Sequence, residues 1–228
     1  MLIPYGDKNP TVRRPMVTVL LIVINCAVFM YLQLAGGFHR EYYNAYLAQF
    51  GLVPARFLSR KLFDFSGPIP VALTPIAAMF LHGNLLHLGG NMLFMWIFGN
   101  NVEDFLGHVR FTIFYFLCGL AASFTYMLFS PLSHYPMIGA SGAIAGVLGA
   151  YFILWPRAQI KTILFLFFFI TTLEVPAVLI LGFWIVLQIL EGFGSIGRAT
   201  GIAWFGHIGG FFAGIALILP RAKRRRRR

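Results

Sequence analysis

Apolar residues in this chain form long, nearly uninterrupted runs, separated by shorter stretches that carry proline, glycine and charged residues. A helix needs roughly 20 mainly apolar residues to cross a hydrocarbon core of about 30 Å. Runs of that kind, together with helix start and stop signals, predict six helices. We expect them over residues 16–35, 82–102, 109–129, 141–155, 175–190 and 203–219.

The apolar run over residues 162–173, TILFLFFFITTL, does not fit this scheme. It is only a dozen residues long before Glu174 and Pro176 interrupt it. Because a helix of that length is too short to cross a bilayer, we expect an interfacial or re-entrant segment. The predicted fold is therefore an all-α polytopic membrane protein with six transmembrane helices.

Composition supports a membrane protein and excludes a water-soluble domain. Hydrophobic residues make up 59% of the 228 residues and charged residues only 11%, with a mean hydropathy of +0.78. Several separate runs are too much apolar sequence for one signal peptide. Cys26 and Cys118 both lie in apolar runs with no metal or redox spacing, so they indicate no cofactor chemistry.

The basic residues predict an orientation. Seven of the last eight residues are arginine or lysine, and they directly follow an apolar run. Six crossings with the N-terminus inside place 13 of the 18 basic residues in the cytoplasm, as the positive-inside rule requires. The expected parts are a cytoplasmic segment 1–15, a helical domain 16–220 with an external first loop 36–81, and a basic cytoplasmic tail 221–228. Such a tail is typical of a membrane surface with anionic lipid, so no nucleic-acid partner is expected despite the net charge of +11.

Polar residues inside a bilayer are costly and indicate function by default. Here they lie near the starts of the second, fourth and sixth predicted helices, and they are His82, His87, Asn91, Ser141 and His207. These three helices run in the same direction in the six-helix topology, so their starts share one depth on the outer side. The fourth helix is only roughly 22 Å long at about 1.5 Å per residue, which places Ser141 below the outer surface.

The residue types match acyl-transfer chemistry. A serine hydroxyl becomes a nucleophile when a base takes its proton, and histidine suits that task, so Ser141 and His207 would form a dyad. Glycines at four-residue spacing, Gly142 and Gly146 on one helix and Gly206, Gly210 and Gly214 on the other, predict a close contact between the two helices. His87, Asn91 and the Ser141 backbone N–H would stabilise the oxyanion.

Some polar residues have simpler interpretations. His82 is expected to orient the first loop, outside the catalytic set. Glu103, Asp104 and Arg110 are expected to form a solvated or loop-bracing cluster between the second and third helices. A zinc protease would need a His-Glu-x-x-His motif, which this sequence lacks, and an aspartyl protease would need two membrane aspartates, whereas every aspartate lies outside the predicted helices.

The combination resembles the rhomboid family of intramembrane serine proteases. The resemblance rests on His87-x-x-x-Asn91, on Gly139-Ala140-Ser141-Gly142, on Gly206-His207 followed by two glycines, and on the FGNNVEDFLG turn over residues 98–107. It extends over about residues 72–219. Two departures stand out: Ala145 replaces an aromatic residue that packs on the histidine in some members, and the first loop lacks a Trp-Arg pair.

The resemblance implies a Ser141/His207 dyad without an acidic third member, an oxyanion site formed by His87, Asn91 and the Ser141 amide, and no metal or cofactor. It also implies cleavage of single-span or polytopic membrane proteins, in or beside their transmembrane segments. The fifth helix and the loop over residues 192–202 would form a lateral gate and cap. The basic tail and the absence of a targeting peptide suit a bacterial inner (plasma) membrane.

Two other functions compete with proteolysis. A catalytically inactive relative would bind membrane clients without cutting them, because fold alone does not establish activity. A small transporter would also carry polar groups near helix starts, but the predicted spans contain no acidic residue suited to ion coupling and the sequence shows no repeat.

Overall fold

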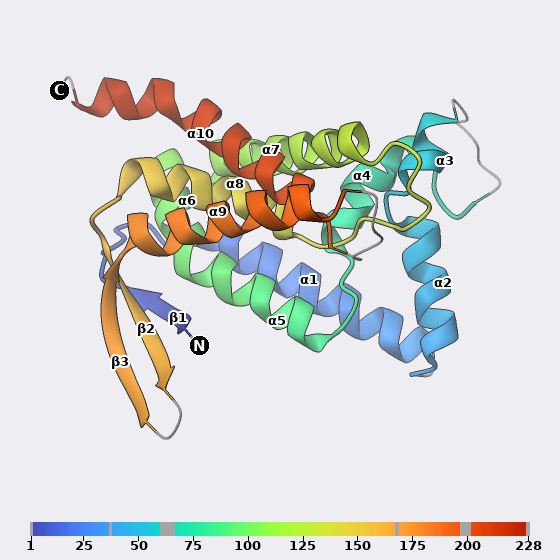
Figure 1. The fold of residues 1–228 in the computed structure, drawn as a ribbon, viewed down its shortest axis with the longest axis horizontal. Helices are drawn as coiled ribbons and strands as arrows, with labels where there is room; N and C mark the ends of the chain where they lie inside the picture. The colour runs from blue at the N-terminus through green and yellow to red at the C-terminus, as the bar shows by residue number, and fades with distance from the viewer. Residues whose placement is uncertain (1, 37, 60–66, 167–168, 197–201, 227–228) are drawn as a thin grey trace.

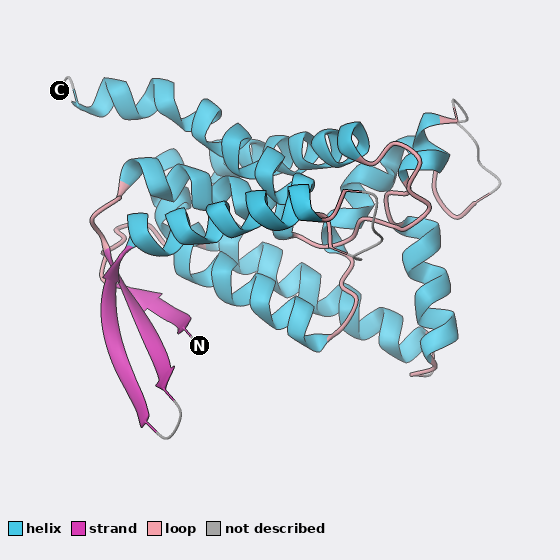
Figure 2. Cartoon of the chain, in the orientation of Figure 1, coloured by secondary structure: helices cyan, strands magenta, loops and turns pink. Residues whose placement is uncertain are grey.

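The computed structural model describes residues 2–36, 38–59, 67–166, 169–196 and 202–226, and most of them are helical (Figures 1 and 2). Among these described residues, four helices are long and apolar enough to cross a membrane: α1 (Met16–Ala35), α7 (His108–Phe129), α9 (Ala177–Gly194) and α10 (Trp204–Arg226). A fifth candidate span is a bent pair over residues 71–80 and 85–106, with an angle of 79°. The molecule is therefore a mostly helical, polytopic membrane protein.

The centre of the bundle is occupied by α8 (Ser141–Leu154), which is shorter than the surrounding helices. Every residue from Gly142 to Tyr151 is buried, because α7, α9 and α10 pack around it. A helix covered by protein on all sides does not have to match the bilayer thickness. At about 1.5 Å per residue it spans roughly 21 Å, as the sequence predicts.

The expected helix over residues 82–102 consists of three consecutive helical segments. They are α5 (Leu85–Phe94), the π-helical turn η3 (Met95–Gly99) and α6 (Asn100–Leu106). The helix begins later than expected because Asn84 is its N-cap, with its side chain accepting a hydrogen bond of 2.8 Å from the His87 backbone N–H. Gly107, at φ +77°, then separates α6 from α7.

The first loop has structure of its own. It contains α2 (Arg40–Phe50) and α3 (Pro54–Leu58), followed by the short helices η1 (Val71–Leu73), α4 (Thr74–Ala77) and η2 (Ala78–Phe80). Tyr43 and Leu47 of α2 pack against Phe29 and Leu32 of α1. Residues 60–66 lie outside the described part of the chain. The loop thus contributes a second, smaller apolar cluster beside the bundle.

The prediction of an all-α fold is wrong, because the chain also forms a three-stranded antiparallel sheet (Figure 2). The strands are β1 (Leu2–Asp7), β2 (Gln159–Leu166) and β3 (Phe169–Pro176), in the order β1-β2-β3. The run expected to be interfacial or re-entrant is therefore a β-hairpin that pairs with the N-terminal segment. Its β-branched and aromatic residues favour strands. Hydrogen bonds between the paired strands also satisfy the backbone N–H and C=O groups of this apolar segment.

Asp7 attaches this sheet to the end of the bundle. Its Oδ2 accepts hydrogen bonds from the Tyr151 hydroxyl at 2.6 Å and from the Asn101 Nδ2 at 2.9 Å. Burial raises the pKa of the Asp7 carboxyl above its ordinary value, although the hydrogen bond from Tyr151 works in the opposite direction. The N-terminal segment is thus held to both α8 and α6.

Of the two roles expected for the charge cluster after the second helix, solvated or loop-bracing, the solvated one is wrong for Glu103, whose side chain is fully buried. Its carboxylate accepts hydrogen bonds from the backbone N–H groups of Val17 and Thr18 at 2.8 and 2.7 Å, and from the Thr18 hydroxyl at 2.6 Å. The His108 Nδ1 lies 2.6 Å away. Glu103 therefore caps the N-terminus of α1, where negative charge is favourable.

Both described ends of the chain lie at one end of the bundle, where the sheet also projects (Figure 1). Helix α10 does not stop at residue 219 but continues through Pro220 to Arg226. The basic residues up to Arg226 therefore extend the last helix rather than forming a separate irregular tail. The C-terminus of α8 and the N-terminus of α9, which connect to the sheet, also lie on this side of the bundle. The N-termini of α8 and α10 therefore point toward the opposite side.

Candidate active site

The site depends on a backbone contact between α8 and α10. A Cβ atom added to Gly210 would lie 2.0 Å from the Gly142 carbonyl oxygen, and one added to Gly214 would lie 2.0 Å from that of Gly146. No side chain fits at such distances, so only glycine allows the two helices to approach this closely. The predicted glycine contact is confirmed, and it brings together the segments that carry Ser141 and His207.

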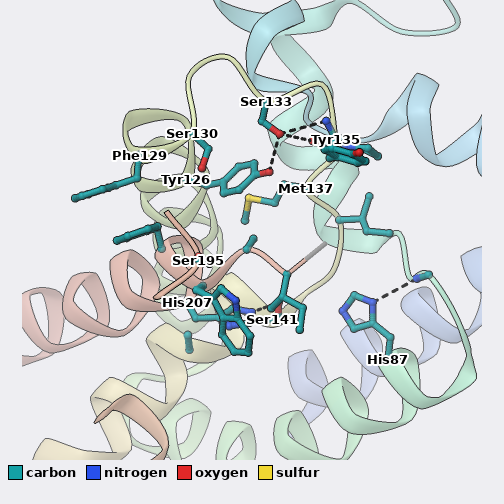
Figure 3. Close-up of a pocket in the computed structure, with 18 of the residues that line it drawn as sticks. His87, Tyr126, Phe129, Ser130, Ser133, Tyr135, Met137, Ser141, Ser195 and His207 are labelled. Atoms are coloured by element: carbon teal, nitrogen blue, oxygen red, sulfur yellow. Dashed lines mark hydrogen bonds between the residues drawn. The ribbon is translucent and has the colours of Figure 1, made fainter. Parts of the chain in front are cut away.

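Ser141 and His207 point toward one another across this contact (Figure 3). The Ser141 Oγ lies 2.8 Å from the His207 Nε2, which is hydrogen-bond distance. Ser141 is the first residue of α8, while His207 lies in the first turn of α10. The arrangement allows the imidazole to take the hydroxyl proton as the oxygen attacks an electrophile.

The other nitrogen of His207 has a partner that the sequence interpretation missed. His207 Nδ1 lies 2.7 Å from the Oε1 of Gln188, which is located on α9 and almost fully buried. The Trp184 ring, one turn earlier on α9, lies 5.9 Å from the imidazole, and the Trp204 ring lies 6.4 Å away. The histidine is thus held by neighbours other than Ala145, where the expected aromatic residue is absent.

Two side-chain donors lie beside the chain just before Ser141. A Cβ on Gly139 would lie 2.7 Å from His87 Nε2 and 3.6 Å from Asn91 Nδ2, so both groups border the space next to this glycine. His87 Nδ1 accepts a hydrogen bond from the Gly83 N–H at 3.3 Å, which leaves the neutral ring's proton on Nε2. Asn91 Nδ2 is buried and has no hydrogen-bond partner among the described residues.

Gly139 itself is suited only to glycine. Its φ of +114° lies in the region that L side chains rarely adopt, and a side chain there would collide with His87. The first N–H groups of α8, including that of Ser141, have no partner within the helix. His87, Asn91 and Ser141 also line the same cavity, which is what a shared oxyanion site requires.

These groups face one cavity of about 1230 Å³ (Figure 3). Apolar side chains from α5, α8, α9 and the start of α10 line much of it, together with the segment that joins α7 to α8. Ser195, Ile196 and Ile202 also contribute, whereas residues 197–201 of the expected cap lie outside the described part of the chain. Within the described residues, no group of three or more histidine, cysteine or acidic side chains could hold a metal ion.

His82 is buried and lies outside this set. Its ring packs edge-on against His87, with ring centroids 5.1 Å apart, and its backbone oxygen accepts a hydrogen bond from the Tyr43 hydroxyl. The backbone of His82 therefore links α2 of the first loop to the segment before α5, while the role predicted for the histidine side chain stays a prediction.

Comparison with known proteins shows the family. The family model described as Rhomboid domain matches residues 72–224. Rhomboid protease GluP of Bacillus subtilis (strain 168) is 34% identical over 209 residues, which are 92% of this chain and 36% of that protein. Rhomboid protein 1, mitochondrial, of Saccharomyces cerevisiae (strain ATCC 204508 / S288c) is 30% identical over 167 residues, 70% of this chain and 45% of that protein. The chain thus spans less than half the length of these two relatives, but the family match covers most of its own length, and the chain belongs to the rhomboid family.

Proposed function

We propose that this protein is an intramembrane serine endopeptidase that cleaves other membrane proteins in or beside their transmembrane segments. The observation that carries the proposal is the 2.8 Å hydrogen bond between Ser141 Oγ and His207 Nε2, inside a cavity formed by membrane helices. Family membership supports the same class of reaction. No cofactor is required, because the nucleophile, the base and the oxyanion donors are all side chains or backbone groups of this chain.

The proposed reaction uses the groups described above. His207 Nε2 takes the proton of Ser141 as the Oγ attacks the scissile carbonyl carbon, which gives a tetrahedral intermediate. His87 Nε2, Asn91 Nδ2 and the Ser141 N–H donate hydrogen bonds to its oxyanion. His207 then gives the proton to the leaving amine, the peptide bond breaks, and an acyl-enzyme remains. Water, activated by the same imidazole, hydrolyses the ester and releases Ser141.

We place the protein in the membrane with six crossings and both termini in the cytoplasm. The crossings would be α1, the α5–α6 segment, α7, the short α8, α9 and α10. The positive-inside rule supports this orientation, since Arg157, Lys161 and the basic residues at the end of α10 then share the cytoplasmic side with the N-terminus. Ser141 then lies below the external surface. A plasma-membrane location is part of this proposal, although some relatives are mitochondrial.

The test is cleavage of a tagged single-span membrane substrate by purified protein in liposomes. Wild type should release a fragment of defined size, whereas Ser141→Ala and His207→Ala, shown to be folded by circular dichroism, should release none. If Ser141→Ala still cuts, the assignment of the nucleophile is wrong. If wild type cuts none of several helix-destabilised substrates but retains them in pull-down, the inactive client-binding relative is the correct function.

A further inference from the structure

Gln188 is a buried polar side chain in an otherwise apolar helix. It lies in the middle of α9 and is only 6% exposed, between apolar residues in the sequence WIVLQIL. An amide in such a position is costly unless its polar atoms have partners. Its Oε1 finds one in His207 Nδ1, at 2.7 Å. The side chain therefore has a specific contact with the histidine that also faces Ser141.

This contact selects the position of the imidazole proton. A carbonyl oxygen accepts hydrogen bonds and cannot donate them, so His207 Nδ1 must carry the proton. A neutral imidazole has one N–H, which leaves Nε2 with a free lone pair directed at Ser141 Oγ, 2.8 Å away. The opposite tautomer would place the proton on Nε2, where it could not accept the serine proton.

The same contact fixes the ring in space. Gln188 and Trp184 are one turn apart, so both lie on the face of α9 that meets His207. On the α8 side, Ala145 offers only a methyl group. Hydrogen bonds at both ring nitrogens, with Trp184 beside the ring, restrict rotation about the side-chain bonds of His207. Helix α9 therefore supplies the orientation that α8 does not.

We propose that Gln188 is a positioning residue, which holds His207 in the Nδ1–H tautomer with Nε2 facing Ser141. This inference rests on the proposed protease function and adds a third member to the dyad, a neutral amide rather than an acid. Gln188 does not line the cavity, and acts only through the imidazole. A further consequence is that displacement of α9 away from α10 would separate Gln188 from His207 and misalign the base.

The kinetic test compares Gln188→Met, which keeps the side-chain length and removes the acceptor, with Gln188→Glu, which restores an acceptor. We expect Gln188→Met to lower kcat roughly 10- to 100-fold with KM unchanged, as for other partners that orient an essential histidine. Gln188→Glu should recover most of kcat and move the acidic limb of the pH profile to higher pH, because a carboxylate favours the imidazolium. Leu190→Met, on the exposed side of α9, is the matched control and should behave as wild type.

Nitrogen-15 NMR of histidine-labelled protein tests the inference without any substrate. With the His207 signal assigned by comparison with His207→Ala, wild type should show the Nδ1–H tautomer, and Gln188→Met should lose it. A wild-type Nε2–H tautomer would overturn the inference. A kcat equal to that of wild type in Gln188→Met would also overturn it. The same holds if Gln188→Met and Gln188→Glu both lose activity and thermal stability, because that result indicates a purely structural role. Because the NMR result needs no cleavage, failure of the proposed function and failure of this inference are distinguishable.

Discussion

The contact between α8 and α10 makes Gly210 a sensitive position. A Cβ atom there would lie 2.0 Å from the Gly142 carbonyl oxygen, whereas ordinary contacts of this kind are 3.4 Å or longer. The obstacle is backbone, so no side-chain rotation can relieve it. Substitution of Gly210 by alanine must therefore move the two helices apart locally by about 1.4 Å, or bend one of them.

The displacement acts directly on the proposed active site. Gly142 follows Ser141 in the chain, and Gly210 lies one turn after His207, so the separation occurs at the level of the Oγ–Nε2 hydrogen bond. The Oγ–Nε2 distance is now 2.8 Å. If it increases by about as much as the helices move apart, the two atoms are no longer within hydrogen-bond distance. We expect Gly210→Ala to lose about 100-fold or more in kcat, because misplacement of a reacting group by about 1 Å has effects of that order.

Stability should change much less than activity. Overpacking of this kind costs about 1–3 kcal/mol, which lowers Tm in detergent without unfolding the protein. The control is Gly182→Ala on α9, where the added Cβ meets only Phe152 at 3.8 Å. That variant should keep full activity and gain up to about 1 kcal/mol, as expected for alanine in place of glycine within a helix. Wild-type cleavage and Tm in Gly210→Ala would refute the argument that this backbone contact sets the geometry of the dyad.

Three further outcomes follow from buried groups. Glu103→Ala should destabilise the protein by about 3–5 kcal/mol in thermal unfolding, because it leaves the N-terminus of α1 without its buried acceptor, and Glu103→Gln by less. The Tm of wild type should rise as pH falls from neutrality toward 3.8, since burial raises the pKa of Asp7 and the folded state binds that proton more tightly; Asp7→Asn should lack this rise. Gly139→Ala should reduce kcat about 10²- to 10³-fold in the cleavage assay by displacing His87, with circular dichroism unchanged.

The transmembrane helices and the polar groups at their starts were predictable because each depends on local sequence. Hydropathy identifies apolar runs of membrane length, and glycine spacing indicates which helices can touch. Ser141 and His207 could be paired before any coordinates, since parallel helices place their starts at the same depth. Most helix bounds are matched to within a few residues, but α9 ends four residues later than expected and α10 seven residues later, and only four or five of the helical segments are long and apolar enough to be candidate spans among the described residues.

The sheet was not predictable from the hairpin sequence alone. Residues 162–173 are apolar at nearly every position, so they lack the alternation that distinguishes a half-buried strand. Pairing with β1 brings in residues from the other end of the chain. For a similar reason the sequence could not decide between a solvated and a bracing role for Glu103: it lies at a helix junction, but its partners, Val17 and Thr18, are remote along the chain.

Gln188 was missed although a signal existed. The rule that polar residues within apolar helices indicate function applies to it directly, but Gln188 lies in the second half of its helix, away from the helix starts where the other polar residues gather. Its partner, the His207 ring, lies on a different helix, so sequence spacing could not join the two. The absence of an aromatic residue at Ala145 was a second indication that the histidine must be oriented from elsewhere.

The central claim is that Ser141 is a nucleophile activated by His207, and covalent labelling in intact membranes tests it most directly. Membranes containing the protein are treated with a fluorophosphonate, and the modified residue is identified by mass spectrometry. The account predicts modification of Ser141 in wild type, none at that position in Ser141→Ala, and loss of nearly all of it in His207→Ala. An unmodified Ser141 in folded wild type, or equal modification of Ser141 with and without His207, would contradict it.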